Sequence, residues 1–480
     1  MAEIFKVHPY RWTPIGKIPH LRASTVPELR EFWTKYYTPN NATLVIVGAV
    51  KHEEAQALAK RYFEWIPRCP DVPAITVREP MPEKPRDVTL KLENAPVPLV
   101  GIAYRTVPLA SDDLVPLKLL ATILADGNSS RAYRELVAKK ELAVGVQSID
   151  FTLEQDGVLA IGAAFAPAGG KEEAALTDLR KQIDEVRKKK VSASELEKAK
   201  NQQLKGLVTE NLRIAYKASL LGNSAVLEGD TSRVNKRLDD IRKTTSDDLL
   251  RVAKKYLDPE RALTFHIKRN LSGMFNKKPN PEDEAPITGK PETSPPPPGR
   301  PGVTRPAEYP AAPPLKGALD FDPTPHFETR ILSNGLKVVV VENHEVPFVS
   351  MWLGLRAGAC TEKKPGTASM AMSMLKKGTR KHSEGKLAEE LERYAIGLGG
   401  SAGMDTSSVT ANCLTEQAER ATKLMAEILM TPAFDAKELE KLRRQVMTDL
   451  AVTSAEPSYI ASREMRKRLY GENPYSRTVQ

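Results

Sequence analysis

Ser369 and Ser373 lie four residues apart in the run GTASMAMSMLKKGT (366–379), with Met372 between them. On a helix, these three side chains share one face. Two histidines and a glutamate at the same places would bind a zinc ion and activate a water molecule. Hydroxyl and thioether groups are poor zinc ligands, and neither is a general base near neutral pH. The run therefore has the layout of a zinc-binding helix without its ligands; an ordinary methionine-rich core helix is the alternative.

The residues around these positions predict the elements that would hold them. Ala371, Met374 and Leu375 recur at helical intervals, and Gly378 follows as the expected C-cap of an amphipathic helix. The neighbouring patterns predict a hairpin, a strand, a second helix and an alternating run, over 327–341, 348–356, 384–396 and 402–414 in turn.

Composition excludes several classes of protein. The chain has 480 residues, 41% of them hydrophobic, and no apolar run long enough to span a membrane. Its net charge is +10, but basic and acidic residues alternate along predicted helices, so no nucleic-acid partner is expected. Cys69, Cys360 and Cys413 are scattered, which predicts neither disulfides nor a thiolate zinc site. Residues 1–7 show no export signal; the compartment stays undetermined, and export is possible if the true N-terminus lies upstream.

A long internal repeat organises the chain. Thr25 to Val47 and Thr245 to His266 each contain an N-capping pair, a helix, a proline turn and an apolar run that predicts a strand. The two turn prolines, Pro39 and Pro259, are 220 residues apart. Repeats of this length are whole domains.

Four segments follow from this repeat. They are a first segment, 1–75, that forms the C-terminal part of one domain; a complete middle segment, 80–270; a proline-rich tether, 271–325; and a third segment, 326–480, that forms the N-terminal part of another domain. The expected fold is α+β, with mostly antiparallel sheets that carry helices on one face. The incomplete copies should leave unpaired strand edges, which predicts poor solubility or association with a complementary piece.

Motifs in the expected order resemble the pitrilysin/insulinase family of zinc metallopeptidases, most closely the branch of mitochondrial processing peptidase. They are HPY (8–10), YYTPNNATL (36–44), SRAYREL (130–136), LSNGL (332–336) and LGGS (398–401). The resemblance covers nearly all of the chain except the tether. It implies a clamshell chamber that encloses an extended peptide.

The family's zinc motif is His-x-x-Glu-His with a later glutamate. Position by position, the resemblance places the two histidines at Ser369 and Ser373, the glutamate at Met372 and the distal acidic ligand near Asp449. Only Asp449 keeps a group that can bind metal. No catalytic or metal-binding residue is therefore expected in this chain, and zinc is expected only in the complete enzyme or an active partner.

The resemblance also implies a substrate-pairing edge strand at Gly400, Ser401, Ala402, Gly403, Met404 and Asp405; an internal strand is the alternative. In the middle segment, Val137 and Val144 occupy positions where active second halves often carry an arginine and a tyrosine.

Three functional hypotheses remain open from the sequence. In the first, the chain is a portion of a two-half zinc metalloendopeptidase that cleaves extended peptides, inactive by itself. In the second, it is a non-catalytic subunit that binds peptides or an active family member. In the third, it is a scaffold that acts through the proline-rich tether. The expected partners are a peptide or unfolded polypeptide and a complementary half or subunit.

Overall fold

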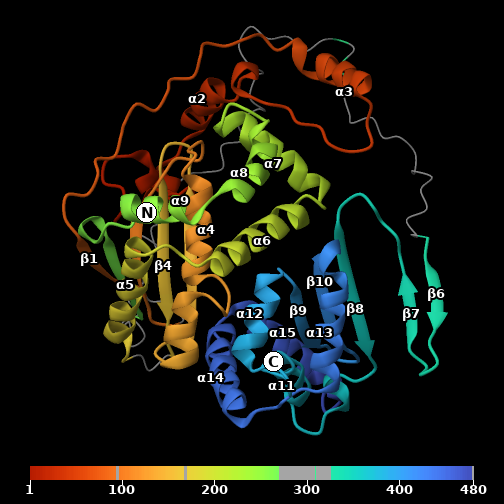
Figure 1. The fold of residues 1–480 in the computed structure, drawn as a ribbon. Helices are drawn as coiled ribbons and strands as arrows, with labels where there is room; N and C mark the ends of the chain where they lie inside the picture. Colours follow the sequence, from red (N-terminus) through yellow and green to blue (C-terminus); the bar gives the residue numbers. More distant parts are fainter. Residues whose placement is uncertain (93–96, 167–169, 270–306, 308, 310–325, 478–480) are drawn as a thin grey trace.

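The computed structural model describes residues 1–92, 97–166, 170–269, 307, 309 and 326–477 (Figure 1). Apart from residues 307 and 309, the predicted tether lies outside the described residues. None of the helices in the described ranges is both long and apolar enough to cross a membrane. The α+β fold class predicted from the sequence is confirmed by the two layered units below.

A five-stranded sheet forms the centre of the middle segment. Its strands are β1 (Arg86–Leu92), β2 (Leu99–Arg105), β3 (Gly145–Thr152), β4 (Gly157–Ala164) and β5 (Leu263–Arg269). They are ordered β1-β5-β2-β4-β3, and only the β1–β5 pair is parallel. The last strand in sequence, β5, thus lies between the first two.

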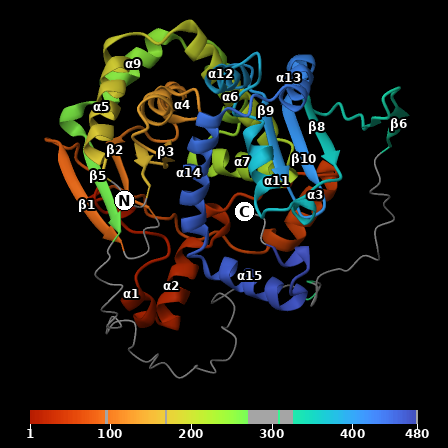
Figure 2. The same ribbon diagram turned by 90° about the horizontal axis from the view of Figure 1, so that it is seen from below.

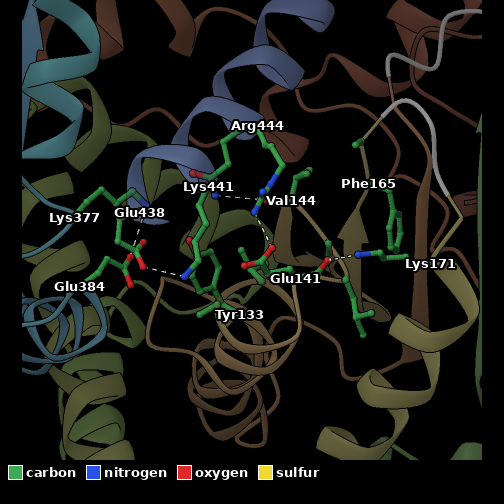
Figure 3. Close-up of a pocket in the computed structure, with 16 residues that line it drawn as sticks. Tyr133, Glu141, Val144, Phe165, Lys171, Lys377, Glu384, Glu438, Lys441 and Arg444 are labelled. Atoms are coloured by element: carbon green, nitrogen blue, oxygen red, sulfur yellow. Dashed lines mark hydrogen bonds and ion pairs between the residues drawn. The ribbon is translucent and has the colours of Figure 1, made fainter. Parts of the chain in front are cut away.

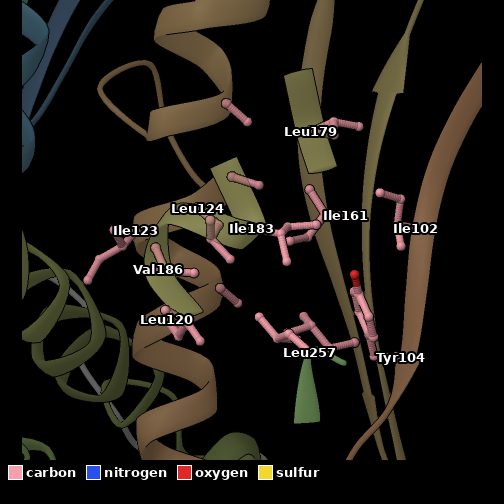
Figure 4. Close-up of a cluster of buried hydrophobic side chains, with 14 of the residues drawn as sticks. Ile102, Tyr104, Leu120, Ile123, Leu124, Ile161, Leu179, Ile183, Val186 and Leu257 are labelled. Atoms are coloured by element: carbon pink, nitrogen blue, oxygen red, sulfur yellow. The ribbon is translucent and has the colours of Figure 1, made fainter. Parts of the chain in front are cut away.

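The helices of the middle segment include two, over 114–125 and 172–188, that pack directly on this sheet. In chain order the helices are α4 (Leu114–Ala125), η4 (Tyr133–Lys139), α5 (Glu172–Lys188), α6 (Ala193–Glu210), α7 (Ile214–Leu227), α8 (Arg233–Lys243), α9 (Ser246–Tyr256) and the short η5 (Pro259–Arg261). Alternate residues of β2, Ile102 and Tyr104, point into a core with Leu120 of α4 and Leu179 of α5 (Figure 4). Burial of this apolar surface is the main stabilising contribution.

The opposite face of the sheet is covered by residues 1–10, an arrangement the sequence did not predict. Phe5 is fully buried against Ala103, Val158 and Leu263. The Glu79 carboxylate accepts hydrogen bonds from three successive backbone N–H groups, those of residues 6, 7 and 8, at 2.7–2.8 Å. Burial alone would raise the pKa of Glu79, but these donors hold it below its usual value.

The third segment forms a smaller unit of the same kind. Strands β8 (Phe348–Leu355), β10 (Ser407–Leu414) and β9 (Gly397–Ala402) form an antiparallel sheet in that order. Its helices are η7 (Ala359–Thr361), α11 (Thr367–Met374), α12 (Glu384–Arg393), η8 (Thr415–Gln417), α13 (Ala418–Met430), α14 (Ala436–Thr453), α15 (Pro457–Tyr470) and η9 (Pro474–Ser476). The hairpin of β6 (Glu328–Ile331) and β7 (Lys337–Val340) is a separate two-stranded sheet that stands apart from β8 (Figures 1 and 2).

The first segment consists of helices with little core. They are η1 (Pro9–Arg11), α1 (Ile18–Ala23), α2 (Val26–Tyr36), η2 (Pro39–Asn41), α3 (His52–Ala59) and η3 (Lys60–Glu64), and none contains a buried residue. The strand predicted over 44–47 was wrong: these residues form no strand. A strand needs a hydrogen-bonded neighbour, and none of the described strands pairs with this run.

Candidate functional site

Helix α11 carries the positions of the incomplete zinc motif. Its first turn is held by Glu362, whose carboxylate accepts hydrogen bonds from the N–H groups of Gly366 and Ala368, both at 2.8 Å. The helix ends at Met374, so the prediction of Gly378 as its C-cap was wrong. Gly378 instead adopts φ +117° in the following turn, where it bridges to Ser383.

The donor groups at the motif positions do not fit a zinc ion. Ser369 and Ser373 are half-buried, while Met372 is 8% exposed and packs on the backbone of β9. Asp449 lies exposed on α14. No cluster of three or more His, Cys, Asp or Glu side chains suited to a metal occurs among the described residues. Two hydroxyls and one thioether cannot replace the three protein ligands of a catalytic zinc site.

Strand β9 packs against α11 and is one of the two outer strands of its sheet. A Cβ atom on Gly400 would lie 2.7 Å from the Met372 carbonyl oxygen, so only glycine permits this approach. The predicted pairing strand is too long at one end, because Gly403, Met404 and Asp405 lie in the turn after β9. There the carbonyls of Gly403 and Met404 accept hydrogen bonds from the N–H groups of Ala359 and Cys360. Peptide pairing along 400–402 stays a prediction.

The middle and third segments are joined by a carboxylate bound in a turn. Glu392 of α12 accepts hydrogen bonds from the N–H groups of Asn128 (2.6 Å) and Ser129 (3.2 Å) and from the Ser129 hydroxyl. Lys198 of α6, almost fully buried, donates to the Ser129 carbonyl at 3.1 Å and lies 3.9 Å from the Glu392 carboxylate. Burial lowers the pKa of Lys198, and the nearby carboxylate opposes this effect.

A cavity of about 280 Å³ lies at the same junction (Figure 3). The middle segment lines it with Tyr133, Val137 and Val144, and α14 lines it with Glu438, Lys441 and Arg444, among others. The structure thus brings Val137 and Val144, the two positions singled out by the resemblance, to one cavity.

Charged groups in this cavity are mostly paired. Arg444 donates to Glu141 at 2.7 Å, Lys441 to Glu438 at 2.9 Å, and Lys377 lies 3.7 Å from Glu384. Burial raises the pKa of Glu384, and Lys377 opposes the rise. Most of the charges that line the cavity are therefore balanced by an opposite charge nearby.

Two domain models of one peptidase family match the chain. The model described as "Peptidase M16 inactive domain" matches residues 24–203, and the model "Insulinase (Peptidase family M16)" matches residues 337–480. The chain belongs to the insulinase (M16) peptidase family. The second match contains α11, so this family member carries serine and methionine where the resemblance expects zinc ligands.

The similar proteins include one named as a zinc protease and one named as a non-peptidase. The zinc protease PqqE of Helicobacter pylori is 26% identical over 263 residues, 54% of this chain and 59% of that protein. The non-peptidase homolog YmxG of the same organism is 28% identical over 145 residues, 29% of this chain and 34% of that protein. The crystal structure of a protease from Helicobacter pylori is 25% identical with a TM-score of 0.52, over 55% of this chain and 64% of that one. The chain thus spans less than two thirds of the length of each.

Sequence reasoning missed the two groups that join the segments. Glu392 reads as one of many charged residues on an amphipathic helix, and 128–129 read as part of a polar turn. Gly127 carried a usable signal, since a glycine between two polar residues predicts a turn with positive φ, and φ is +81° here. Nothing in the local sequence indicates which distant carboxylate would bind that turn.

Proposed function

We propose that this chain is a portion of a zinc metalloendopeptidase of the M16 family that binds extended peptides but carries no zinc site of its own. The zinc-binding side chains of the working enzyme would lie outside these 480 residues, in the same polypeptide or in an active partner. The peptide would add as a strand along the outer edge of β9.

The observation that carries this proposal is the contact between Met372 and Gly400. It holds the motif helix, with serine and methionine at the motif positions, directly over an outer strand. Among the described residues, no hydrogen bond joins the outer edge of β9 to another element. A peptide strand would satisfy these backbone groups.

The test is peptide binding without hydrolysis. Fluorescence anisotropy should detect binding of an unstructured, uncharged labelled peptide to the full chain, while mass spectrometry finds the peptide intact. A version of the peptide that is N-methylated on its backbone should lose binding, because strand addition needs its N–H groups.

A matched pair of glycine variants locates the site. Gly400→Ala places a methyl group against Met372, which shifts β9 and should weaken binding about tenfold. Gly399→Ala meets no atom within 4 Å and should bind like the parent. Equal binding by both variants, or unchanged binding of the N-methylated peptide, would exclude this site. Stoichiometric zinc with chelator-sensitive hydrolysis by the chain alone would contradict the proposal as a whole.

A non-catalytic subunit is the second candidate function. It is favoured by the similarity to a homolog named as a non-peptidase. The coding sequence upstream of the Met1 codon discriminates between the two, because an in-frame His-x-x-Glu-His motif supports the enzyme portion. If that motif is absent, zinc that co-purifies only with a bound family member supports the subunit.

A further inference from the structure

A second cavity, of about 470 Å³, lies within the middle segment between helices α4, α6, α7 and α8 (Figure 1). Helices α4 and α6 line it with residues 114–122 and 202–210, each at positions i, i+1, i+4, i+5 and i+8, so one face of each helix is turned toward it. All of the described residues that line it lie between 114 and 241. Its volume falls in the range of small-molecule pockets, about 300–1,000 Å³.

Helices α4 and α6 run antiparallel, which gives the cavity two distinct ends. Lys198, near the start of α6, donates to the carbonyl of Ser129, just after the end of α4. Five residues later, the Gln203 amide donates to the Thr122 hydroxyl at 3.0 Å, one turn back along α4. Asp126, the C-cap residue of α4, therefore lies at one end of the cavity, and the last turn of α6 lies at the other.

Asp126 carries a carboxylate where its surroundings disfavour a negative charge. It is half-buried at the C-terminal end of α4, where the helix dipole is negative. The Ser148 hydroxyl donates to it at 2.5 Å; the Thr122 hydroxyl, at 3.3 Å, shares its single proton with the Lys118 carbonyl. Burial raises the pKa of Asp126, and the charge of Asp150 adds to the rise. Among the described side chains, no Lys, Arg or His forms an ion pair with it.

The other charges that line the cavity leave an excess of negative charge. Lys118 lies 3.5 Å from Asp150, and Arg237 pairs with Glu228; neither carboxylate is part of the lining. Glu210, in the last turn of α6, forms no ion pair within the described part of the chain. The cations of the lining are thus balanced from outside it, whereas its carboxylates are not. This distribution favours a cationic ligand.

A glycine in the middle of α6 leaves room for the body of such a ligand. Glycine is unfavourable inside a helix, and a Cβ atom on Gly206 would meet no atom within 4 Å, so no crowding requires glycine here. The space it leaves is bordered by apolar side chains that include Leu119, Leu207 and Ile241. An alkyl or aryl group would bury apolar surface against them, which a bare inorganic ion cannot do.

We propose that this cavity binds a small organic ammonium ion, a primary amine carried on an alkyl or aryl body. The nitrogen would donate to the Asp126 carboxylate in a charge-assisted hydrogen bond. The Gln203 amide, whose nitrogen is engaged by Thr122, carries a second acceptor oxygen on the same lining. The body would lie along Gly206 and Leu207. Binding would balance a carboxylate that burial and the helix dipole both disfavour.

Calorimetric titration of the full chain with hexylammonium chloride at neutral pH tests the proposal. Saturable one-to-one binding is expected. Hexan-1-ol and hexanoate have the same body without the positive charge, and they should bind about tenfold more weakly or worse. Ammonium chloride has the charge without the body and should also bind weakly, because it buries no apolar surface.

Two substitutions locate the site from its two sides. Asp126→Asn should weaken hexylammonium binding about tenfold or more, whereas Glu173→Gln, an exposed loss of charge on α5, should not. Gly206→Leu fills the cavity and should abolish binding, while its higher helix propensity keeps α6 folded. Gly385→Leu is the matched control, because this glycine of α12 also has no atom within 4 Å of an added Cβ. Circular dichroism checks that each variant is folded.

Each of four outcomes would overturn the proposal. The first is no saturable binding of hexylammonium to the parent. The second is equal binding of hexan-1-ol, which would show that the charge is irrelevant. The third is parent-like binding by folded Asp126→Asn or folded Gly206→Leu, which would place the amine elsewhere. The fourth is binding of a lysine-containing peptide without binding of hexylammonium, which would indicate a polypeptide ligand. Hexylammonium binding needs neither a peptide nor zinc, so these readouts are independent of the proposed function.

Discussion

The carboxylate of Glu392 occupies the space that a side chain on Gly127 would need. A Cβ atom on Gly127 would lie 2.7 Å from the Glu392 Cδ and Oε1 atoms. Gly127 also has φ +81°, a conformation that favours glycine. The turn that follows Gly127 directs two backbone N–H groups at the same carboxylate. Gly127 thus leaves room for one of the contacts that join the middle and third segments.

Gly127→Ala should lower the free energy of unfolding by about 1–3 kcal/mol and loosen the junction. Gly229→Ala is the matched control, because Gly229 has φ +70° but no atom within 4 Å of an added Cβ. Denaturant unfolding measures both variants. If Gly127→Ala lowers the free energy of unfolding by more than Gly229→Ala does, the difference measures displacement of the Glu392 carboxylate. An equal decrease in both variants would mean that only backbone strain matters.

Glu392→Gln should destabilise the chain because it leaves the buried Lys198 ammonium without its nearby negative charge. Loss of one partner of a buried charged pair predicts a cost of about 1–3 kcal/mol. Thermal or urea unfolding at pH 7 measures it. Glu389→Gln, an exposed change on the same helix, should cost almost nothing. A neutral result for Glu392→Gln would show that the turn, and not the charge, fixes the junction.

The loss of folding stability at acidic pH should depend on Glu195. Burial alone would raise its pKa, but hydrogen bonds from Arg131 (2.7 and 3.0 Å) and Ser192 lower it to about 2. A depressed pKa gives stability that is present above the unfolded value of about 4.3 and is lost as pH falls toward the folded value. Stability should therefore decrease between pH 5 and 3 by more in the parent than in Glu195→Gln.

Glutamine at position 195 can still complete the capping box with Ser192, so the comparison isolates the charge. Urea unfolding at each pH measures the difference. Glu197→Gln, an exposed change on the same helix, should leave the pH dependence unchanged. If both variants change the pH dependence of stability equally, general charge repulsion, and not the ion pair with Arg131, determines that pH dependence.

The motif helix should still present two positions to one metal ion. Ser369→His with Ser373→His places two imidazoles four residues apart on one helix face, where zinc binding should raise the melting temperature. The parent should show no such shift. Ser369→His with Ala371→His is the control, because residues two apart do not face each other. No zinc-dependent shift in the first variant would mean that α11 no longer presents the motif geometry.

The sequence by itself determined the local elements and the chemistry that is missing. Periodicity located β8 to within one residue and α12 at its first residue, because these signals act over a few residues. The replacement of ligand types at 369, 372 and 373 could also be read directly. The repeat of 220 residues was visible because each copy carries its own capping box and proline turn.

Only the tertiary structure decided what each element packs against. Residues 44–47 have a strand-like sequence but no strand, because strand formation requires a neighbour from far along the chain. Two further contacts join residues that are far apart in the sequence and could not be predicted from local patterns. They are the burial of Phe5 beneath the middle sheet and the contact of Glu392 with the turn at Gly127, 265 residues earlier in the chain. Local patterns specify how the backbone folds, whereas long-range hydrogen bonding and burial decide which of two equivalent repeats becomes part of a core.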